Sequence, residues 1–196
     1  MAGNLPIPEI DLGFAIAAGS LDADETFQLM KDTISKIVTE YGLATIRYGL
    51  IVFGDTADIK IQFSNLTKVE NLLRYISVVP KKKSGAALDE MLKEAETMFS
   101  AAGGRPRARK VLVVITDLAS GKPASQVREA AKTLEDKDIK VVAVAVGREA
   151  DSKELELLTS TDNIIEEQKN VLPNDLKEAI MIKVLKGNLI CCRLID

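Results

Sequence analysis

The residue types most used in protein catalysis are scarce in this chain. None of its 196 residues is a histidine, which excludes a histidine base, a histidine metal ligand or a Ser-His-Asp triad within it. The acidic groupings Glu166-Glu167 and Asp136-Asp138 have no partner placed to form an acid–base pair. Gly19-Ser20 and Gly54-Asp55 are similar to phosphate-binding turns, but the chain has no G-x-G-x-x-G and no Walker sequence. We therefore predict that the chain is not an enzyme.

The two cysteines, Cys191 and Cys192, are adjacent in the sequence. Neighbouring cysteines rarely bond to each other because the short ring would be strained. They can bond to another segment or chain, or they can remain free thiols. The sequence leaves both alternatives open.

Two surface motifs bear on location and partners. Asn65-Leu66-Thr67 is an N-glycosylation sequon in a predicted loop, and it slightly favours an extracellular protein. The stretch from Gly103 to Lys110 carries four positive charges. It either binds a glycosaminoglycan or another acidic partner, or it is a solvated loop that keeps the edge of the following strand soluble.

Composition limits the remaining classes of partner. The net charge of −3 and the pI near 5.3 predict no attraction to nucleic acid, and Lys81-Lys82-Lys83 is too short a run to change that. No apolar stretch reaches the roughly 18 residues that a membrane helix needs. Residues 1–9 have no apolar region typical of a signal peptide, which does not argue against secretion if this domain comes from a longer chain.

Apolar runs of strand length alternate with amphipathic stretches of helical period. This order predicts an α/β fold with a mostly parallel sheet and helices on both faces. Asp22 or Asp24 is expected to cap the first helix, and Asn174 the last one, before Gly187 stops it. The predicted strands are 10–17, 46–53, 57–63, 110–116, 140–146 and 163–166, and the predicted helices are 24–41, 69–76, 86–99, 125–134, 152–158 and 174–185. We predict one domain at 10–187, an N-terminal extension at 1–9 and a C-terminal tail at 188–196.

A set of ordered segments carries a family pattern. They are 11–16 (DLGFAI), 27–31 (FQLMK), 47–54 (RYGLIVFG), 85–88 (GAAL), 111–117 (VLVVITD) and 139–147 (IKVVAVAVG). Over residues 10 to 186 the chain resembles a von Willebrand factor A domain, also called an integrin I-like domain. The resemblance implies a three-layer Rossmann-like fold, with a six-stranded, mostly parallel sheet and one antiparallel edge strand.

The resemblance also implies a metal-ion-dependent adhesion site at the carboxyl edge of the sheet. That site needs Asp-x-Ser-x-Ser after the first strand, a Thr in a second loop and an Asp after the central strand, which give oxygen ligands for Mg²⁺ or Mn²⁺. One coordination position stays open for the carboxylate of a partner. In this chain these positions fall on Ala17, Gly19, Leu21, Lys82 and Asp117. Because only Asp117 matches, we expect a degenerate site that binds no metal.

Two alternatives remain for the residues around this site. With a one-residue shift in register, Ser20 could join Asp22, Asp24, Ser84 and Asp117 in a divergent oxygen cage for Mg²⁺ or Ca²⁺. Otherwise an ammonium, from Lys82 or a neighbouring lysine, pairs with Asp117 and replaces the charge of the ion. The candidate binding residues are Ser20, Asp22, Lys82, Ser84, Asp117 and Leu118.

The resemblance implies a non-enzymatic adhesion or protein-interaction module, similar to collagen VI-like and matrilin-like A domains. It would act outside the cell as part of a larger chain, with a protein partner and with no metal. An intracellular scaffold for complex assembly, in the cytoplasm, is one alternative, and a metal-dependent adhesin is another. Without an ion to bias the closing helix, we expect the domain to keep one conformation. The oligomeric state stays open.

Overall fold

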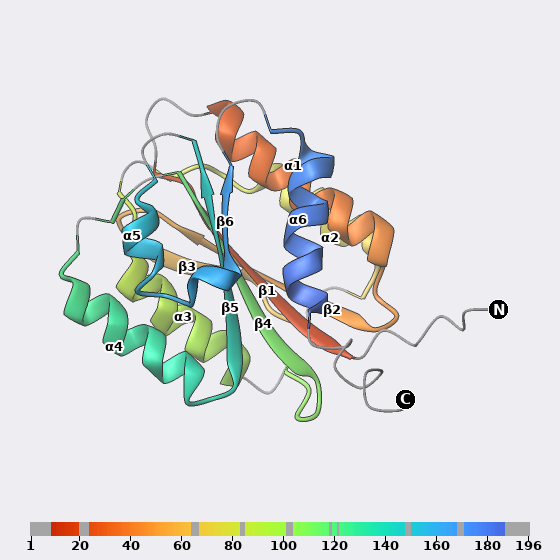
Figure 1. The fold of residues 1–196 in the computed structure, drawn as a ribbon. Coiled ribbons are helices and arrows are strands. Elements are labelled where there is room, and N and C mark those ends of the chain that lie inside the picture. The colour runs from red at the N-terminus through yellow and green to blue at the C-terminus, as the bar shows by residue number, and fades with distance from the viewer. Residues whose placement is uncertain are drawn as a thin grey trace, which may run out of the picture.

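The computed structural model describes residues 9–19, 24–63, 67–82, 85–100, 104–117, 119–120, 122–147, 150–167 and 171–186. Within them a six-stranded sheet lies between two layers of helices (Figure 1). The strands run in the order β3-β2-β1-β4-β5-β6, and only β3 is antiparallel to its neighbour. Their bounds are β1 (Ile10–Ala17), β2 (Ile46–Phe53), β3 (Ala57–Ile61), β4 (Arg109–Thr116), β5 (Ile139–Val146) and β6 (Ile164–Glu167). The predicted fold class is confirmed.

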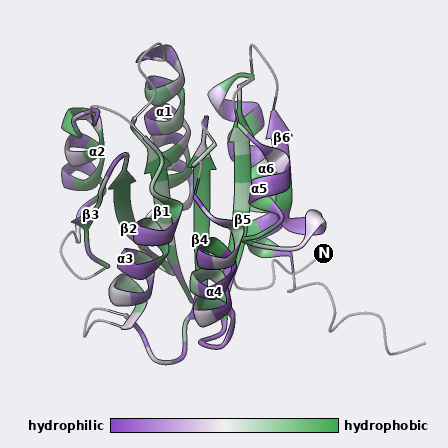
Figure 2. Cartoon of the chain, turned by 90° about the vertical axis from the view of Figure 1, so that its left-hand side faces the viewer, coloured by the Kyte–Doolittle hydropathy of each residue, from purple (hydrophilic) through white to green (hydrophobic). Residues whose placement is uncertain are grey.

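The middle of the sheet is apolar on both of its faces. All eight residues of β1 are buried, and β1 pairs in parallel with both β2 and β4. A strand covered on both faces gains from a continuous apolar run rather than from alternation, which is why β1, β4 and β5 were visible in the sequence. Figure 2 shows these strands as the apolar centre of the molecule.

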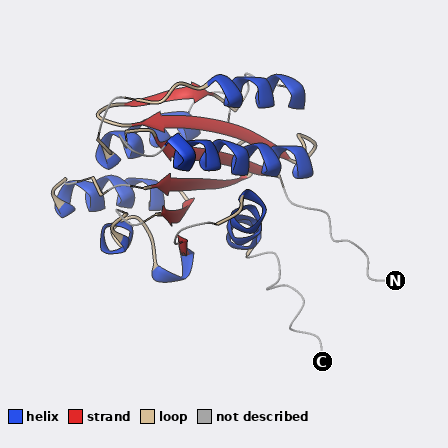
Figure 3. Ribbon diagram, turned by 90° about the horizontal axis from the view of Figure 1, so that it is seen from above, coloured by secondary structure: helices blue, strands red, loops and turns tan. Residues whose placement is uncertain are grey.

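Helices cover the two faces of the sheet in separate groups (Figures 1 and 3). Apolar side chains of α1, α2 and α6 form one core with the strands, and those of α3, α4 and α5 form the other. Along β1, Leu12 and Phe14 belong to the first core, whereas Ala15 and Ala17 belong to the second. The bounds are α1 (Asp24–Tyr41), α2 (Val69–Val78), α3 (Leu88–Ser100), α4 (Ala124–Glu135), α5 (Ser152–Leu155) and α6 (Pro173–Leu185).

The helix ends correct part of the predicted capping. The last helix takes Leu172 as its N-cap, with Pro173 in its first turn, a position that suits proline because no N–H is needed there. The cap predicted at Asn174 is therefore wrong. Gly42 has a φ of +60° directly after α1, the left-handed conformation that commonly ends a helix. Asp22 and Gly187 lie outside the described residues.

Two further element bounds differ from the prediction. The strand β3 ends at Ile61 rather than Phe63, after an irregularity in its pairing with β2. The helix α5 ends at Leu155 instead of Leu158. Among the described residues no helix has the length and apolar character to cross a membrane.

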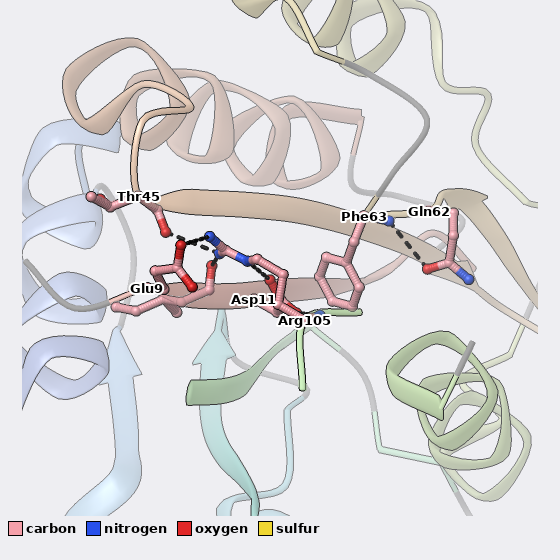
Figure 4. Close-up of polar contacts among 7 residues, drawn as sticks. Glu9, Asp11, Thr45, Gln62, Phe63 and Arg105 are labelled. Carbon is pink, nitrogen blue, oxygen red and sulfur yellow. Dashed lines mark hydrogen bonds and ion pairs between the residues drawn. The ribbon is translucent and has the colours of Figure 1, made fainter. Parts of the chain in front are cut away.

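The basic stretch at 103–110 is not simply a solvated loop, because Arg105 lies over the amino edge of the sheet (Figure 4). Its Nε donates to Oδ1 of the buried Asp11 at 2.9 Å, and its backbone N–H donates to Oδ2 at 2.6 Å. The guanidinium also donates to the carbonyls of Ile10 (2.7 Å) and Thr45 (3.0 Å), and it pairs with Glu9 at 3.3 Å. The solvated-loop interpretation is therefore wrong for Arg105.

Candidate functional site

The candidate site lies at the carboxyl edge of the sheet, where the loops after the parallel strands converge. Ala18 and Gly19 follow β1, Gly54 follows β2, and Asp117 follows β4. Lys82 joins them from the segment between α2 and α3. The structure thus brings Ala17, Gly19, Lys82 and Asp117 to one edge of the sheet, where the resemblance implied the site.

Backbone hydrogen bonds tie these loops together. The Ala18 N–H donates to the Phe53 carbonyl at 2.7 Å, and the Ala18 carbonyl accepts from the Lys82 N–H at 2.9 Å. The Ala87 N–H donates to the Gly54 carbonyl at 2.6 Å. The segment that carries Lys82 is therefore held against the ends of both β1 and β2 by the main chain.

Gly85 allows this segment to approach the β2–β3 turn closely. Its φ is +78°, a region that side chains other than glycine rarely adopt. A Cβ atom at this position would lie 3.2 Å from the backbone nitrogen of Asp55. Both constraints favour glycine here, which explains one residue of the family pattern at 85–88.

The Lys82 side chain points toward β3. Its ammonium lies 2.7 Å from Oδ2 of Asp58 and 2.6 Å from Oγ1 of Thr56. Lys60 also contacts Asp58, at 3.2 Å. Hydrogen bonds from Lys82 and then Lys60 lower the pKa of the Asp58 carboxyl below its ordinary value. The Lys82 contact that the structure shows is therefore with Asp58, and the pairing of Asp117 with Lys82 or a neighbouring lysine stays a prediction.

Asp117 stands directly after the buried Thr116 at the end of β4. Only 8% of its surface is exposed. A carboxylate this deeply buried must be compensated by nearby donors or charges. The structure thus holds an acidic side chain at the position where the resemblance implied one.

The described residues at the remaining metal positions do not fit a divalent cation. Ala17 is 2% exposed and packs in the core with Phe53, and it has no oxygen to offer. Gly19 has no side chain, and Lys82 brings a positive charge that would repel the ion. Among the described residues no group of three His, Cys, Asp or Glu side chains could hold a metal.

The divergent oxygen cage stays a prediction. Ser20, Leu21, Asp22, Ser84 and Leu118 lie outside the described residues. Another member, Asp24 at the start of α1, accepts a hydrogen bond from Lys81 at 2.9 Å. Asn65, Cys191, Cys192 and the tail at 188–196 are likewise outside the described part of the chain.

No sequence pattern pointed to the side chains that contact the residues following β4. Glu154 in α5 accepts from the Ser120 N–H at 2.7 Å and also from the Ser120 hydroxyl. The next lysine, Lys122, lies 3.8 Å from Oδ1 of Asp89 in α3. That oxygen is buried and accepts no hydrogen bond from the described residues. Glu154 and Asp89 are distant in sequence from the loop, so spacing alone could not identify them.

Comparison with known proteins agrees with this architecture. The model of the von Willebrand factor type A domain matches residues 16–181. The collagen alpha-4(VI) chain of Mus musculus is 27% identical over 184 residues, which is 92% of this chain and 8% of that protein. Matrilin-1 of Homo sapiens is 30% identical over 143 residues, which is 70% of this chain and 28% of that protein. The chain thus spans less than a third of the length of these relatives.

Solved structures show the same fold. Proximal thread matrix protein 1 from the mussel byssus superposes with a TM-score of 0.76 and 19% identity, covering 91% of this chain and 46% of that chain. A second structure of that protein has a zinc-occupied metal-ion-dependent adhesion site, with a TM-score of 0.76 and 18% identity over 90% of this chain and 47% of that one. The sheet order, the loops at its carboxyl edge and the matched sequence model together show that this chain belongs to the von Willebrand factor type A domain family.

Proposed function

We propose that this domain is an interaction module of an extracellular matrix or cell-surface protein and that it binds a protein partner without a metal ion. The relatives include collagen chains and matrilin-1. This similarity favours adhesion or protein interaction over catalysis as the function of the domain. As part of a longer chain it would act outside the cell.

The contact between Lys82 and Asp58 carries the metal-independent part of this proposal. A divalent cation needs several oxygen ligands in place of water, and this edge of the sheet instead carries an ammonium. The ammonium is already ion-paired at 2.7 Å, and the loop that bears it is tied to β1 and β2. This paired and tethered lysine supports a carboxyl edge that is ordered without an ion.

Helix surfaces next to this edge offer area for a protein partner. A groove of about 440 Å³ lies between α3 and α4. Acidic side chains of Asp89, Glu96 and Glu129 line it together with Lys93. Such a groove is complementary to a partner with basic side chains, and charges at the rim of an interface chiefly set specificity and association rate.

The test compares binding with and without divalent cations. We expect the chain to bind immobilised matrix proteins, with fibrillar collagen as the first probe, equally well in millimolar Mg²⁺ and in a chelator. Calorimetry with Mg²⁺, Mn²⁺ or Ca²⁺ should show no binding in the micromolar range. The variant Ala17→Asp/Gly19→Ser/Leu21→Ser/Lys82→Thr, which restores the family's ligand types, is the matched positive control for metal binding.

Two results would contradict the proposal separately. Micromolar metal binding by the unmodified chain, abolished by Asp117→Ala, would reject metal independence. If the chain binds none of the purified matrix proteins, the interaction function is rejected. Expression in a secretory system tests the location, because an occupied glycan that disappears in Asn65→Gln is expected for an extracellular domain but not for a cytoplasmic scaffold.

A further inference from the structure

Positively charged side chains gather around the carboxyl end of α6, at the amino edge of the sheet. The Lys140 ammonium donates to the Lys183 carbonyl at 2.6 Å. Arg109 donates to the carbonyls of Val184 (3.0 Å) and Lys186 (3.4 Å). We call Arg109, Lys140, Lys183 and Lys186 the basic cluster. It brings together the starts of β4 and β5 and the end of α6, which lie far apart in the sequence.

The side chains of the basic cluster are close enough for their positive charges to act on one another. Burial lowers the pKa of Lys140, and so do the charges of Arg109, Lys186 and Lys183. The charged groups that shift this ammonium are thus all cations. The carbonyls at the helix end attract them, but a helix terminus carries only about half a unit of negative charge. The charges that act on Lys140 are therefore positive, although the whole chain has a net charge of −3.

A groove of about 600 Å³ adjoins the cluster and shares Lys140 with it. Two further cations, Arg128 and Lys132, line this groove and are exposed. Its other polar groups are the carboxylates of Glu135 and Glu156 and the hydroxyl and amide side chains of Thr159, Ser160 and Asn163. Its lining among the described residues has no aromatic side chain.

This chemistry distinguishes between possible anionic partners. Nucleic acids bound as single strands depend on base stacking against aromatic side chains, which this lining lacks. Sugar hydroxyls are matched by the hydroxyl and amide groups of the groove, and sulfates are matched by clustered lysine and arginine. Cations on both sides of Lys140, in the cluster and in the groove, suit a chain with repeated negative charges.

We propose that the basic cluster and the adjoining groove bind a sulfated polysaccharide. The basic stretch at 103–110 is not itself the site, because Arg105 is committed to Asp11 and only Arg109 joins the cluster. The site lies at the edge opposite the candidate protein-interaction site, so neither proposal depends on the other.

The test measures affinity for immobilised heparin by surface plasmon resonance at low and at physiological salt. The variant is Lys183→Gln/Lys186→Gln, which spares the side chains of Arg109 and Lys140 that hold the end of α6. The matched control, Lys81→Gln/Lys122→Gln, removes the same charge near the opposite edge. We expect the unmodified chain to bind, added salt to weaken binding, and the variant to lose about tenfold in affinity, whereas the control changes less than about twofold.

Thermal unfolding followed by circular dichroism checks that both variants fold. An equal loss in the control would overturn the proposal, because it would show attraction by net charge rather than a site. The proposal also fails if the unmodified chain does not bind heparin at low salt. Single-stranded DNA that binds as tightly as heparin would reject a sugar-specific site.

Discussion

Asp11 is fully buried at the start of the central strand, and Arg105 compensates its charge. Both carboxylate oxygens accept hydrogen bonds from Arg105, one from the guanidinium and one from the backbone. Burying an isolated carboxylate is costly, whereas a paired and hydrogen-bonded one is tolerated. The pair therefore fixes the loop before β4 against the start of β1.

Removing the cation should leave this carboxylate without its ion pair. We predict that Arg105→Ala lowers the free energy of unfolding by about 3–5 kcal/mol, measured by urea denaturation. Arg107→Ala is the control, because Arg107 is exposed in the same loop and its loss should change stability by less than about 0.5 kcal/mol. Equal effects of the two substitutions would show that the Asp11 contact is not what stabilises the loop.

Tyr48 presents the opposite case, because its buried polar group is not compensated by a hydrogen bond from the described residues. It is 4% exposed and stacks on Phe14 with ring centroids 6.4 Å apart. Its hydroxyl has no hydrogen-bond partner among the described residues. Burial, and to a lesser extent Tyr41, raises the pKa of Tyr48 far above its ordinary value of 10.0.

We predict that Tyr48→Phe does not destabilise the domain at neutral pH and makes it relatively more stable in alkali. In the unfolded chain the phenol ionises near pH 10.0, whereas in the folded chain it stays protonated. The raised pKa thus contributes stability below pH 10, and that contribution is lost as the pH rises further. Urea denaturation at neutral pH and above pH 10 checks this, and equal alkaline losses in both proteins would contradict it.

At the scale of elements, two glycines let α3 lie close to the sheet. Gly13 in β1 and Gly49 in β2 are directly paired. A Cβ atom at Gly49 would lie 2.5 Å from the sulfur of Met98, and one at Gly13 would lie 2.5 Å from its terminal methyl. The Met98 side chain therefore occupies the space that side chains at positions 13 and 49 would otherwise fill.

We predict that Gly49→Ala destabilises the domain by about 1–3 kcal/mol, because the added methyl overpacks this contact. Combined with Met98→Ala, the same substitution should cost less than the sum of the two single changes, since the methyl enters space that Met98 has left. A double-mutant cycle by urea denaturation measures this coupling. Simple additivity would show that α3 does not press on Gly49.

The elements themselves could be predicted well, and the site only in part. Buried strands such as 110–116 can be recognised in the sequence because both of their faces are apolar. The bounds predicted for α1 from its apolar spacing match the observed ones. Lys82 was assigned to the correct edge by the resemblance, but its pairing with Asp58 depends on β3 folding back beside β2. Arg105 looked solvated because its partner, Asp11, is 94 residues away.

At the scale of the whole molecule, the two edges at which we propose binding are separated by the length of the sheet. The carboxyl edge is held by loop hydrogen bonds around Lys82, and the amino edge by Arg105 and the basic cluster. The end of α6 is bonded to side chains from both β4 and β5. If the far edge holds no ion, as we propose, nothing there favours a second position of this helix.

We therefore predict one conformation of the domain, whether or not divalent cations are present. Hydrogen exchange of the α6 amides should be unchanged by millimolar Mg²⁺, whereas Lys140→Met should speed exchange in the last turn of α6. Lys132→Met, in α4, is the control for loss of a lysine. Slower exchange in α6 on addition of Mg²⁺ would contradict the prediction.

The central position of β1 has a consequence for biosynthesis. This strand comes first in the sheet's sequence, yet one of its edges is covered only by β4, which begins at Arg109. At about 5–20 residues per second, a ribosome needs on the order of 5–20 s to add the roughly 90 residues between them. During that interval a nascent chain exposes an unpaired apolar strand, so a chaperone or rapid collapse onto α1 and β2 must protect it from aggregation.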